Sequence, residues 1–284
     1  MHSTPAWLNS ELRQSLVEIT RRAGREILDV YGSDFATETK ADNSPLTQAD
    51  LRAHRLIIAL LAQVTPRLPV LSEESADISY AERSSWPEYW LVDPLDGTRE
   101  FVSRNGEFTV NIALIREHRP VLGVVHIPVS DTTYSGVPGK GAFRESNDRG
   151  AARIGVQTSA VTPLRVLGSR SHGNPELARR LTALGPHSLR GVGSSIKLCL
   201  VADGSADLYP RLGPTSEWDI AAGQAVVEAA GGQVVAAADG KPLRYNTGPR
   251  LLNPDFLAFG DPRCYARWAA SISPVQGRIP PSGG

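Results

Sequence analysis

The sequence predicts a fold that changes along the chain, with helices and a largely antiparallel sheet (α+β) in the first half and α/β units in the second. Amphipathic stripes at 9–31 and 47–64 predict two helices, because apolar side chains recur there at helical spacing. Apolar runs at 108–115 and 121–128 flank a charged turn and predict paired strands. From Pro163 onward, short apolar strands alternate with helical patterns.

The elements of the first half follow from periodicity and from their end signals. The helix at 9–31 begins at an Asn-Ser pair that offers an N-cap, and the next helix carries Asp50 in its first turn. A buried strand at 89–93 delivers Asp93 at its carboxyl end. Further strands are expected at 70–75, which contains two glutamates, and in a glycine-punctuated hairpin at 132–145.

The change at Pro163 divides the chain into an N-terminal half, 1–160, and a C-terminal half, 161–273. In the second half, strands are expected at 165–169, 206–210 and 255–260, with a hairpin at 233–245. Helices are expected at 175–184, 194–204, 218–232 and 262–271. The Pro- and Gly-rich tail, 274–284, is predicted to be disordered.

Composition restricts the class of protein. The chain has 284 residues, 41% of them apolar and 21% charged, with a formal net charge of zero. Such a balance argues against a polybasic coat for nucleic-acid polymers or an electrostatic membrane anchor. The two cysteines, Cys199 and Cys264, lack metal-ligand spacing, and the apolar run at 56–64 is too short to span a bilayer. We therefore expect a cytoplasmic protein without a secretory signal or an integral membrane segment.

The segment WLVDPLDGTREF carries the first chemical signal. Asp93 and Asp96 lie three residues apart at a strand end, where they can bracket one Mg²⁺ ion or bridge two. The proline between them keeps the first aspartate extended and leaves the Leu95 carbonyl available as a ligand. Gly97 and Thr98 would present N–H groups to a phosphate at a helix start. A plain Asp-Pro-Gly surface turn explains the motif equally well when it stands alone.

Three further acidic positions favour the metal interpretation. Glu73 and Glu74 lie at another strand end, Asp50 at a helix start, and Asp219 at the start of a helix rich in small residues. Each of these acids by itself is more often a cap or a solvated side chain. Four such sites in one chain indicate a carboxylate-lined centre.

A phosphatase with an aspartyl nucleophile is the sharpest rival. Phosphatases of the haloacid dehalogenase type carry Asp-x-Asp-Gly-Thr, in which the first aspartate attacks phosphorus and the second is the general acid. Here one extra residue separates the aspartates, and the strands that follow are predicted to be antiparallel. No GxxxxGK[ST] phosphate loop and no GxGxxG dinucleotide fingerprint is present either. We therefore reject the rival in favour of metal-activated water.

Together, DPLDGT, SEES and WDIAAG resemble the Mg²⁺-dependent, lithium-sensitive phosphatase superfamily of inositol monophosphatase and fructose-1,6-bisphosphatase. KADNSPLTQAD, GSRSH, GSSIK and YPRLGP are similar to its CysQ-type branch, the 3′(2′),5′-bisphosphate nucleotidases. The resemblance covers roughly residues 10–260 in chain order. It implies an αβαβα layered sandwich, in which the N-terminal half carries the metal site and the C-terminal half adds nucleotide contacts and one ligand.

The resemblance also implies a ligand set for two or three Mg²⁺ ions per site. Glu73, Asp93 and the Leu95 carbonyl would hold the first ion. Asp93, Asp96 and Asp219 would hold the second. Such a pair of metal ions can clamp the phosphate between the attacking and leaving oxygens of an in-line displacement.

Catalytic roles follow from the same resemblance. Thr98, hydrogen-bonded to Asp50, would orient and deprotonate the attacking water, with help from Glu73. Glu74 is expected to shape the site rather than bind metal, and Gly97 to contact the phosphate together with Thr98. No covalent phospho-enzyme is expected.

Four positions in the second half are implied as substrate contacts. Ser194 and Lys197 would meet the non-reacting 5′-phosphate, and His172 and Arg211 would flank the adenine or ribose. Each has a purely structural alternative: the histidine can close a turn, the lysine can be solvated, and the arginine can support the fold.

The function implied is hydrolysis of adenosine 3′,5′-bisphosphate (PAP) to AMP, with the 5′-phosphosulfate PAPS as a second candidate substrate, in sulfur assimilation. The implied partner is this small bisphosphate nucleotide and not a nucleic-acid polymer. One alternative is a broad inositol-1-phosphate or fructose-1,6-bisphosphate phosphatase, and another is a non-catalytic nucleotide- or metal-binding regulator. A peripheral place at the inner face of the cell membrane is an alternative location, and the sequence leaves the oligomeric state open.

Overall fold

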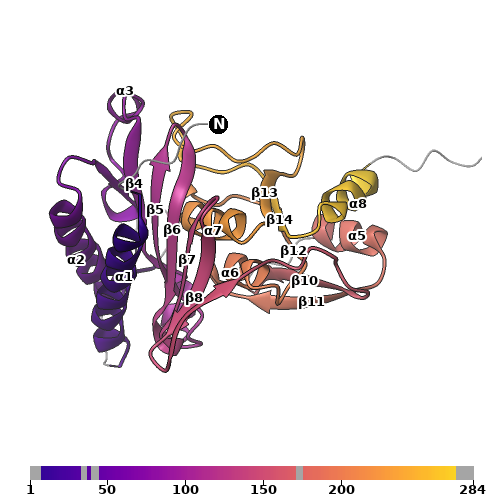
Figure 1. Ribbon diagram of the computed structural model, residues 1–284, viewed down its shortest axis with the longest axis horizontal. Helices are drawn as coiled ribbons and strands as arrows, with labels where there is room; N and C mark the ends of the chain where they lie inside the picture. Colours follow the sequence, from indigo (N-terminus) through magenta and orange to yellow (C-terminus); the bar gives the residue numbers. More distant parts are fainter. Residues whose placement is uncertain (1–7, 33–36, 40–44, 171–174, 273–284) are drawn as a thin grey trace, which may run out of the picture.

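The computed structural model describes residues 8–32, 37–39, 45–170 and 175–272, and its larger sheet has seven strands (Figure 1). Along this sheet the order is β3-β4-β5-β6-β7-β8-β9. Only β3 and β4 are parallel, and every other neighbouring pair is antiparallel, as predicted for the first half. The strands are β3 Val70–Ser72, β4 Glu88–Asp96, β5 Thr109–Arg116, β6 Arg119–Ile127, β7 Thr132–Val137, β8 Gly141–Ser146 and β9 Arg149–Ile154.

The second half forms a five-stranded mixed sheet of order β11-β10-β12-β14-β13. Strand β10 runs parallel to both of its neighbours, whereas β14 is antiparallel to β12 and β13. These strands are β10 Leu164–Ser169, β11 His187–Val192, β12 Leu208–Arg211, β13 Gln233–Ala236 and β14 Phe256–Phe259. A separate short pair consists of β1 Thr37–Thr39 and β2 Pro45–Thr47.

Helices occupy three layers around the two sheets, as Figure 1 shows. The outer layer on the seven-stranded sheet is α1 Ser10–Tyr31 and α2 Gln48–Val64, and the layer between the sheets is α6 Ile196–Ala202 and α7 Glu217–Ala229. The layer on the far side of the second sheet is α5 Pro175–Leu184 and α8 Arg263–Ile272. Short helices complete the described part: η1 Glu73–Ser75, α3 Tyr80–Arg83, α4 Thr98–Val102 and η2 Pro128–Ser130. The predicted αβαβα sandwich is confirmed.

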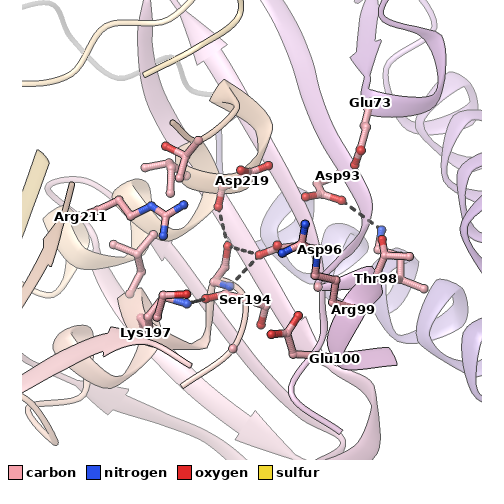
Figure 2. Close-up of a pocket in the computed structure, with 18 of the residues that line it drawn as sticks. Glu73, Asp93, Asp96, Thr98, Arg99, Glu100, Ser194, Lys197, Arg211 and Asp219 are labelled. Carbon is pink, nitrogen blue, oxygen red and sulfur yellow. Dashed lines mark hydrogen bonds between the residues drawn. The ribbon is translucent and has the colours of Figure 1, made fainter. Parts of the chain in front are cut away.

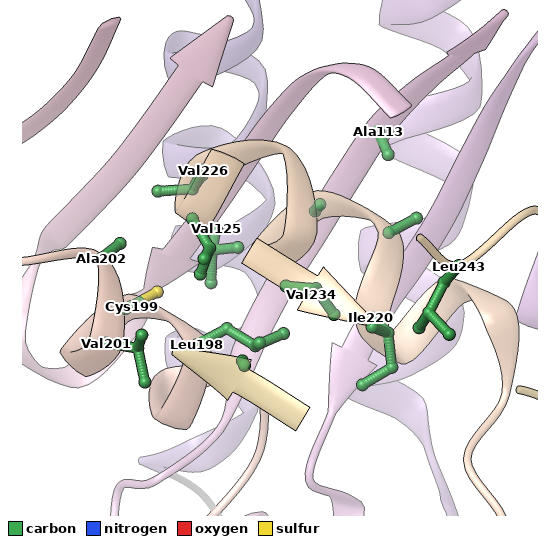
Figure 3. Close-up of a cluster of buried hydrophobic side chains, with 14 of the residues drawn as sticks. Ala113, Val125, Leu198, Cys199, Val201, Ala202, Ile220, Val226, Val234 and Leu243 are labelled. Atoms are coloured by element: carbon green, nitrogen blue, oxygen red, sulfur yellow. The ribbon is translucent and has the colours of Figure 1, made fainter. Parts of the chain in front are cut away.

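Three apolar clusters lie between successive layers. One joins α1 and α2 to the outer face of the larger sheet, and another joins α5 and α8 to the smaller sheet. The largest cluster lies between the two sheets and includes α6 and α7 (Figure 3). Its members come from both halves of the chain, for example Val125, Leu198 and Val234. Burial of this shared surface holds the two halves together.

Helix α7 approaches the larger sheet closely because glycines face it. A Cβ atom on Gly123 would collide with the Ala222 carbonyl oxygen, and one on Gly136 would lie 2.9 Å from the Val226 Cα. The small side chains that distinguish this helix in the sequence permit the same close approach. The packing fixes the axis of α7 and therefore the position of Asp219 in its first turn.

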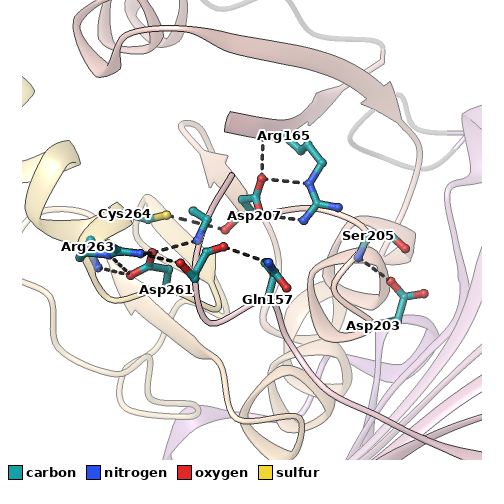
Figure 4. A network of polar contacts seen from close by, with 10 residues as sticks. Gln157, Arg165, Asp203, Ser205, Asp207, Asp261, Arg263 and Cys264 are labelled. Carbon is teal, nitrogen blue, oxygen red and sulfur yellow. Dashed lines mark hydrogen bonds and ion pairs between the residues drawn. The ribbon is translucent and has the colours of Figure 1, made fainter. Parts of the chain in front are cut away.

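Polar contacts join β10 to the residue before β12 and hold the segment between the two sheets, and Figure 4 shows this network. Asp207, fully buried, accepts hydrogen bonds from the backbone N–H of Arg165 at 2.8 Å and from its guanidinium at 3.0 and 2.7 Å. Asp261 accepts from the N–H of Ala160 at 3.0 Å and from Arg263. The two large sheets fall on either side of residue 160, and the proposed division into halves at that point stays a prediction.

Several local predictions needed correction. The segment 233–245 is not a full hairpin, because β13 pairs with β14 and only an isolated bridge joins Val235 to Pro242. Strand β4 continues through a bulge to Asp96 instead of ending at Asp93. The strand expected at 70–75 ends at Ser72, because residues 73–75 form the short helix η1. The elements β1, β2, α3, β9 and β11 were not predicted, since such short stretches carry no clear period. The predicted disordered tail lies outside the described residues, and none of the described helices has the length and apolarity to cross a bilayer.

His126 is a buried titratable group at the contact between α1 and the larger sheet. Its Nδ1 lies 2.9 Å from the Thr133 hydroxyl, and Gly24 of α1 packs against the ring. Burial, and then the charges of Arg21 and Arg25, lower the pKa of His126 to about 3. The imidazole is therefore neutral near pH 7, and its 3.9 Å approach to Asp131 is not an ion pair there.

This histidine predicts acid sensitivity of the fold. Because its folded pKa lies below the unfolded value of about 6.5, the unfolded chain binds an extra proton as the pH falls below that value. The free energy of unfolding should therefore decrease towards pH 3, by up to about 1.4 kcal/mol per pH unit from this group. Urea unfolding of wild type and His126→Gln at pH 7, 6 and 5 measures the effect. Equal slopes in the two proteins would contradict it.

Candidate active site

A cleft of ≈ 490 Å³ opens where the two halves of the chain meet. Its walls come from the end of β4, the start of α4, the segment 193–198, β12 and the first turn of α7. Figure 2 shows Glu73, Asp93 and Thr98 on one side of the cleft and Lys197 and Arg211 on the other. The cleft therefore has an acidic wall and a cationic wall.

The turn DPLDGT forms part of the acidic wall. A β-bulge between Asp93 and Asp96 interrupts the register with β5, as expected where a proline cannot donate to a sheet. The N–H of Leu95 donates to Asp93 Oδ1 at 3.1 Å, while the Leu95 side chain is buried in the core, so this residue faces the cleft with its backbone. Gly97 follows with φ +94°, which favours glycine, and α4 begins at Thr98.

Electrostatic repulsion concentrates at Asp93, whose side chain is only 1% exposed. Burial raises its pKa well above the ordinary value, and four neighbouring carboxylates add to the effect: Glu73, Asp96, Asp219 and Asp50. Burial and then the charge of Asp96 likewise raise the pKa of Asp219. Such mutual destabilisation of carboxylates is typical of a functional centre and not of a surface turn.

Hydrogen bonds orient the other two aspartates of the cleft. Asp96 Oδ2 accepts from the N–H and the hydroxyl of Ser195, at 2.7 and 2.8 Å. Asp219 Oδ2 accepts from the N–H of Ser216 at 2.9 Å, which caps the start of α7. The Ser195 hydroxyl also lies 2.5 Å from the Asp219 carbonyl oxygen and 3.0 Å from the Asn111 amide. The strand β4 and the helix α7 are thus linked through one serine.

The cationic wall centres on a buried lysine. Lys197 is 6% exposed, and its ammonium donates to the carbonyls of Ser194 at 2.6 Å and Val192 at 3.0 Å. The ammonium also lies 5.4 Å from the centre of the Tyr209 ring. Burial lowers the pKa of Lys197 to about 8, so it remains mostly protonated at neutral pH. Arg211 lines the same wall and donates to the Pro214 carbonyl at 3.0 Å.

The structure brings most of the predicted residues into one cleft. Those that line it are Glu73, Asp93, Leu95, Asp96, Gly97, Thr98, Ser194, Lys197, Arg211 and Asp219. Asp50 is fully buried on α2 and acts on the site through its charge near Asp93. Glu73 lines the cleft and Glu74 does not, and the role of Glu73 as a metal ligand stays a prediction. The predicted contact His172 lies outside the described residues, and the bond between Thr98 and Asp50 stays a prediction.

Sequence reasoning missed several residues of the cleft. Arg99 and Glu100, which follow the DPLDGT turn, line it, as do Tyr209 and Thr215. Ser195 was also missed, although it is the second serine of GSSIK and the one that binds Asp96. A small polar residue beside a predicted contact is a weak signal, because only the fold shows which serine turns inward.

The donors of the acidic wall fit a hard divalent cation. Within the described ranges, no three His, Cys, Asp or Glu side chains form a ready-made cage. The wall instead offers separated carboxylates and the backbone at Leu95, which leaves room for water and phosphate oxygens. Mg²⁺ prefers this arrangement of a few carboxylates plus substrate oxygens. A cation would also relieve the repulsion that raises the pKa of Asp93.

Comparisons with known proteins place this geometry in a family. A model of the inositol monophosphatase family matches residues 8–272. The chain belongs to that family. Its enzymes are generally Mg²⁺-dependent, and the phosphatase class expected from the sequence is thereby confirmed.

Relatives within the inositol monophosphatase family are similar over most of their length. The 3′(2′),5′-bisphosphate nucleotidase CysQ of Escherichia coli K12 is 48% identical over 241 residues, 84% of this chain and 96% of the relative. The crystal structure of CysQ from Bacteroides thetaiotaomicron is 41% identical with a TM-score of 0.78, covering 89% of this chain and 98% of that one. The extragenic suppressor protein suhB from Bartonella henselae is 27% identical with a TM-score of 0.75, covering 92% and 98%. The resemblance to the CysQ-type branch is confirmed.

The repulsion at Asp93 predicts an unusual effect of substitution. Asp93→Asn should stabilise the metal-free protein, because it removes a buried charge from among other carboxylates. We expect its melting temperature in excess chelator to rise by about 2–4 °C for each kcal/mol of repulsion removed.

Asp207→Asn is the matched control, since Asp207 is equally buried but paired with Arg165. Its loss of a paired charge should lower the melting temperature. Calorimetry of the two variants in chelator provides the measurement. A decrease for Asp93→Asn as large as that for Asp207→Asn would contradict the interpretation.

Proposed function

We propose that this protein is a Mg²⁺-dependent 3′(2′),5′-bisphosphate nucleotidase that hydrolyses the 3′-phosphate of PAP to AMP and inorganic phosphate. The observation that carries the proposal is the pairing of two unlike walls in one cleft. The acidic wall suits a metal-held reacting phosphate, whereas Lys197, with a cation 6% exposed to solvent, suits a second anion. A monophosphate has no group that would need that second site.

The acidic wall would hold two or three Mg²⁺ ions through Glu73, Asp93, the Leu95 carbonyl, Asp96 and Asp219. When bound, the metal would supply charge neutralisation at the phosphate and a lowered pKa for a coordinated water. The bulge after Asp93 presents both aspartates and the intervening backbone to the same side. The hydrogen bonds from Ser195 hold the Asp96 carboxylate in place before any ligand arrives.

The chain's own groups would direct the attack on phosphorus. Thr98, which lines the acidic wall, would orient the attacking water and, through its predicted hydrogen bond to the buried Asp50, take up its proton with help from Glu73. Water attacks phosphorus, the bond from phosphorus to the ribose 3′ oxygen breaks, and that oxygen takes a proton from a solvent water to leave as the 3′-hydroxyl. Gly97 and Thr98 contact the phosphate through their N–H groups. The reaction needs no side-chain nucleophile, which is consistent with the spacing of the two aspartates.

The second phosphate and the nucleoside would occupy the cationic wall. Lys197 and Ser194 bind the 5′-phosphate, and Arg211 flanks the adenosine, as His172 was predicted to do. The Ser194 hydroxyl is buried and has no hydrogen-bond partner among the described residues, so it is available to a ligand. PAPS carries the same two anionic positions and is a second candidate substrate. The product AMP and the 3′-phosphate chemistry fit a role in sulfur assimilation.

Phosphate release from a panel of substrates tests the proposal: PAP, PAPS, inositol-1-phosphate and fructose-1,6-bisphosphate. PAP should have the highest kcat/KM, and excess chelator should abolish turnover. Asp93→Asn should lower kcat by at least about 100-fold, since loss of metal-based charge stabilisation costs several kcal/mol. Faster turnover of inositol-1-phosphate would favour a broad sugar phosphatase, and a wild type inactive on every substrate would favour a binding protein.

Lys197→Gln should distinguish binding of the 5′-phosphate from binding of the reacting 3′-phosphate. The variant loses a charge-assisted contact to the 5′-phosphate, so the KM for PAP should rise about tenfold or more. The loss should be smaller for adenosine 3′-monophosphate, which lacks that phosphate. Initial rates with both substrates provide the measurement. An equal loss for the two would mean that Lys197 supports the fold and does not bind the second anion.

Location and partners are proposed on the same basis. The substrate is a small nucleotide, and both cysteines are buried free thiols, which fits a reducing cytoplasm. A peripheral place at the inner face of the membrane gains no support from the described residues and stays a prediction.

A further inference from the structure

The segment 193–195, which links the two walls of the cleft, is hydrogen-bonded to a residue that does not line the cleft, Glu107. The residues Gly193-Ser194-Ser195 bridge β11 and α6 and line the cleft. Glu107, in the segment between α4 and β5, reaches this bridge and accepts a hydrogen bond from the N–H of Gly193 at 2.7 Å. It belongs to the first half of the chain, whereas the bridge belongs to the second.

Glu107 is itself held by an arginine. Arg170 donates to both carboxylate oxygens, from Nε at 3.0 Å and from a terminal nitrogen at 2.7 Å. The same guanidinium donates to the Gly191 carbonyl at 3.2 Å, at the end of β11. Although burial alone would raise it, the bonds from Arg170 and Gly193 hold the pKa of Glu107 below its ordinary value. A bidentate pair of this kind fixes direction as well as distance.

Glu107 packs tightly against two glycines, Gly193 and Gly97. A Cβ atom on Gly193 would lie 2.7 Å from the Glu107 carbonyl oxygen and 2.9 Å from its Cβ. A Cβ atom on Gly97 would lie 3.2 Å from the same carbonyl oxygen and 3.3 Å from the Cβ of Ser194. Glu107 is therefore in contact with both Gly97 of the DPLDGT turn and the Gly193–Ser195 bridge.

The bridge adopts a conformation that needs such support. Ser194 has φ +43°, in the left-handed region that non-glycine residues rarely adopt. The Ser194 carbonyl accepts a hydrogen bond from the Lys197 ammonium (Figure 2). The next residue, Ser195, donates its N–H to Asp96. A shift of the bridge would therefore move the second anion subsite relative to the acidic wall.

We propose that Glu107 is a positioning residue that fixes the distance between the acidic wall and the second anion subsite, and so sets the preference for a bisphosphate over a monophosphate. The inference rests on the proposed function. It differs from that proposal because Glu107 touches no substrate and acts through the N–H of Gly193 and the guanidinium of Arg170. The bisphosphate needs both walls at the correct distance, whereas a 3′-monophosphate needs only one.

The test compares PAP with adenosine 3′-monophosphate, which shares the nucleoside and the reacting phosphate. For Glu107→Ala, the ratio of kcat/KM for PAP to that for the monophosphate should fall about tenfold, mostly through a higher KM for PAP. Glu107→Gln should fall between this variant and wild type, because its amide oxygen can still accept from Gly193. Arg170→Gln, at a half-exposed side chain, should lower the ratio in the same direction if the Glu107 variants fold poorly.

Glu88→Gln is the matched control, because Glu88 is 23% exposed and paired with Arg116, while Glu107 is 22% exposed and paired with Arg170. Its ratio should equal that of wild type. An unchanged ratio in folded Glu107 and Arg170 variants would overturn the inference, as would an equal fall in kcat for both substrates. A wild type that does not prefer PAP would instead refute the proposed function, so the two failures are distinguishable.

Discussion

Repulsion between buried carboxylates is the constraint that the surrounding fold has to overcome at this site. Asp93, Asp96 and Asp219 come from two distant parts of the chain and meet in the cleft. Burial raises the pKa of all three, and the charges of neighbouring carboxylates add to the rise at Asp93 and Asp219. Isolated segments would not hold such charges together. Strand β4, between β3 and β5, and helix α7, between the two sheets, hold them there because both elements are fixed by apolar packing. The core thus maintains a cluster of carboxylates whose mutual repulsion a bound cation would relieve.

The two walls of the cleft divide the chemical work. In the proposed function, hydrolysis would depend on the turn after β4 and the start of α7, and recognition on the segment from Gly193 to Lys197 and on β12, which line the same cleft. A family with this division can change its substrates by altering the second wall while the first stays the same.

Much of the acidic wall could be predicted from the sequence because its carboxylates lie in short motifs at strand ends and helix starts. The preference for metal-activated water over an aspartyl nucleophile, drawn from the spacing of Asp93 and Asp96, stays a prediction. Ser195 and Glu107 could not be predicted, since their roles depend on contacts with residues 99 and 86 positions away. The strands β9 and β11 were missed for a related reason, because exposed edge strands need no apolar period.

One carboxylate oxygen of Asp219 accepts a hydrogen bond from the N–H of Ser216, at the cap of α7. Asp219 also lines the cleft. A single side chain therefore takes part in both helix initiation and ligand binding. Whatever neutralises its charge also changes the local opening equilibrium of the first turn of α7. Hydrogen exchange at the amides of this turn would thus report on occupancy of the cleft.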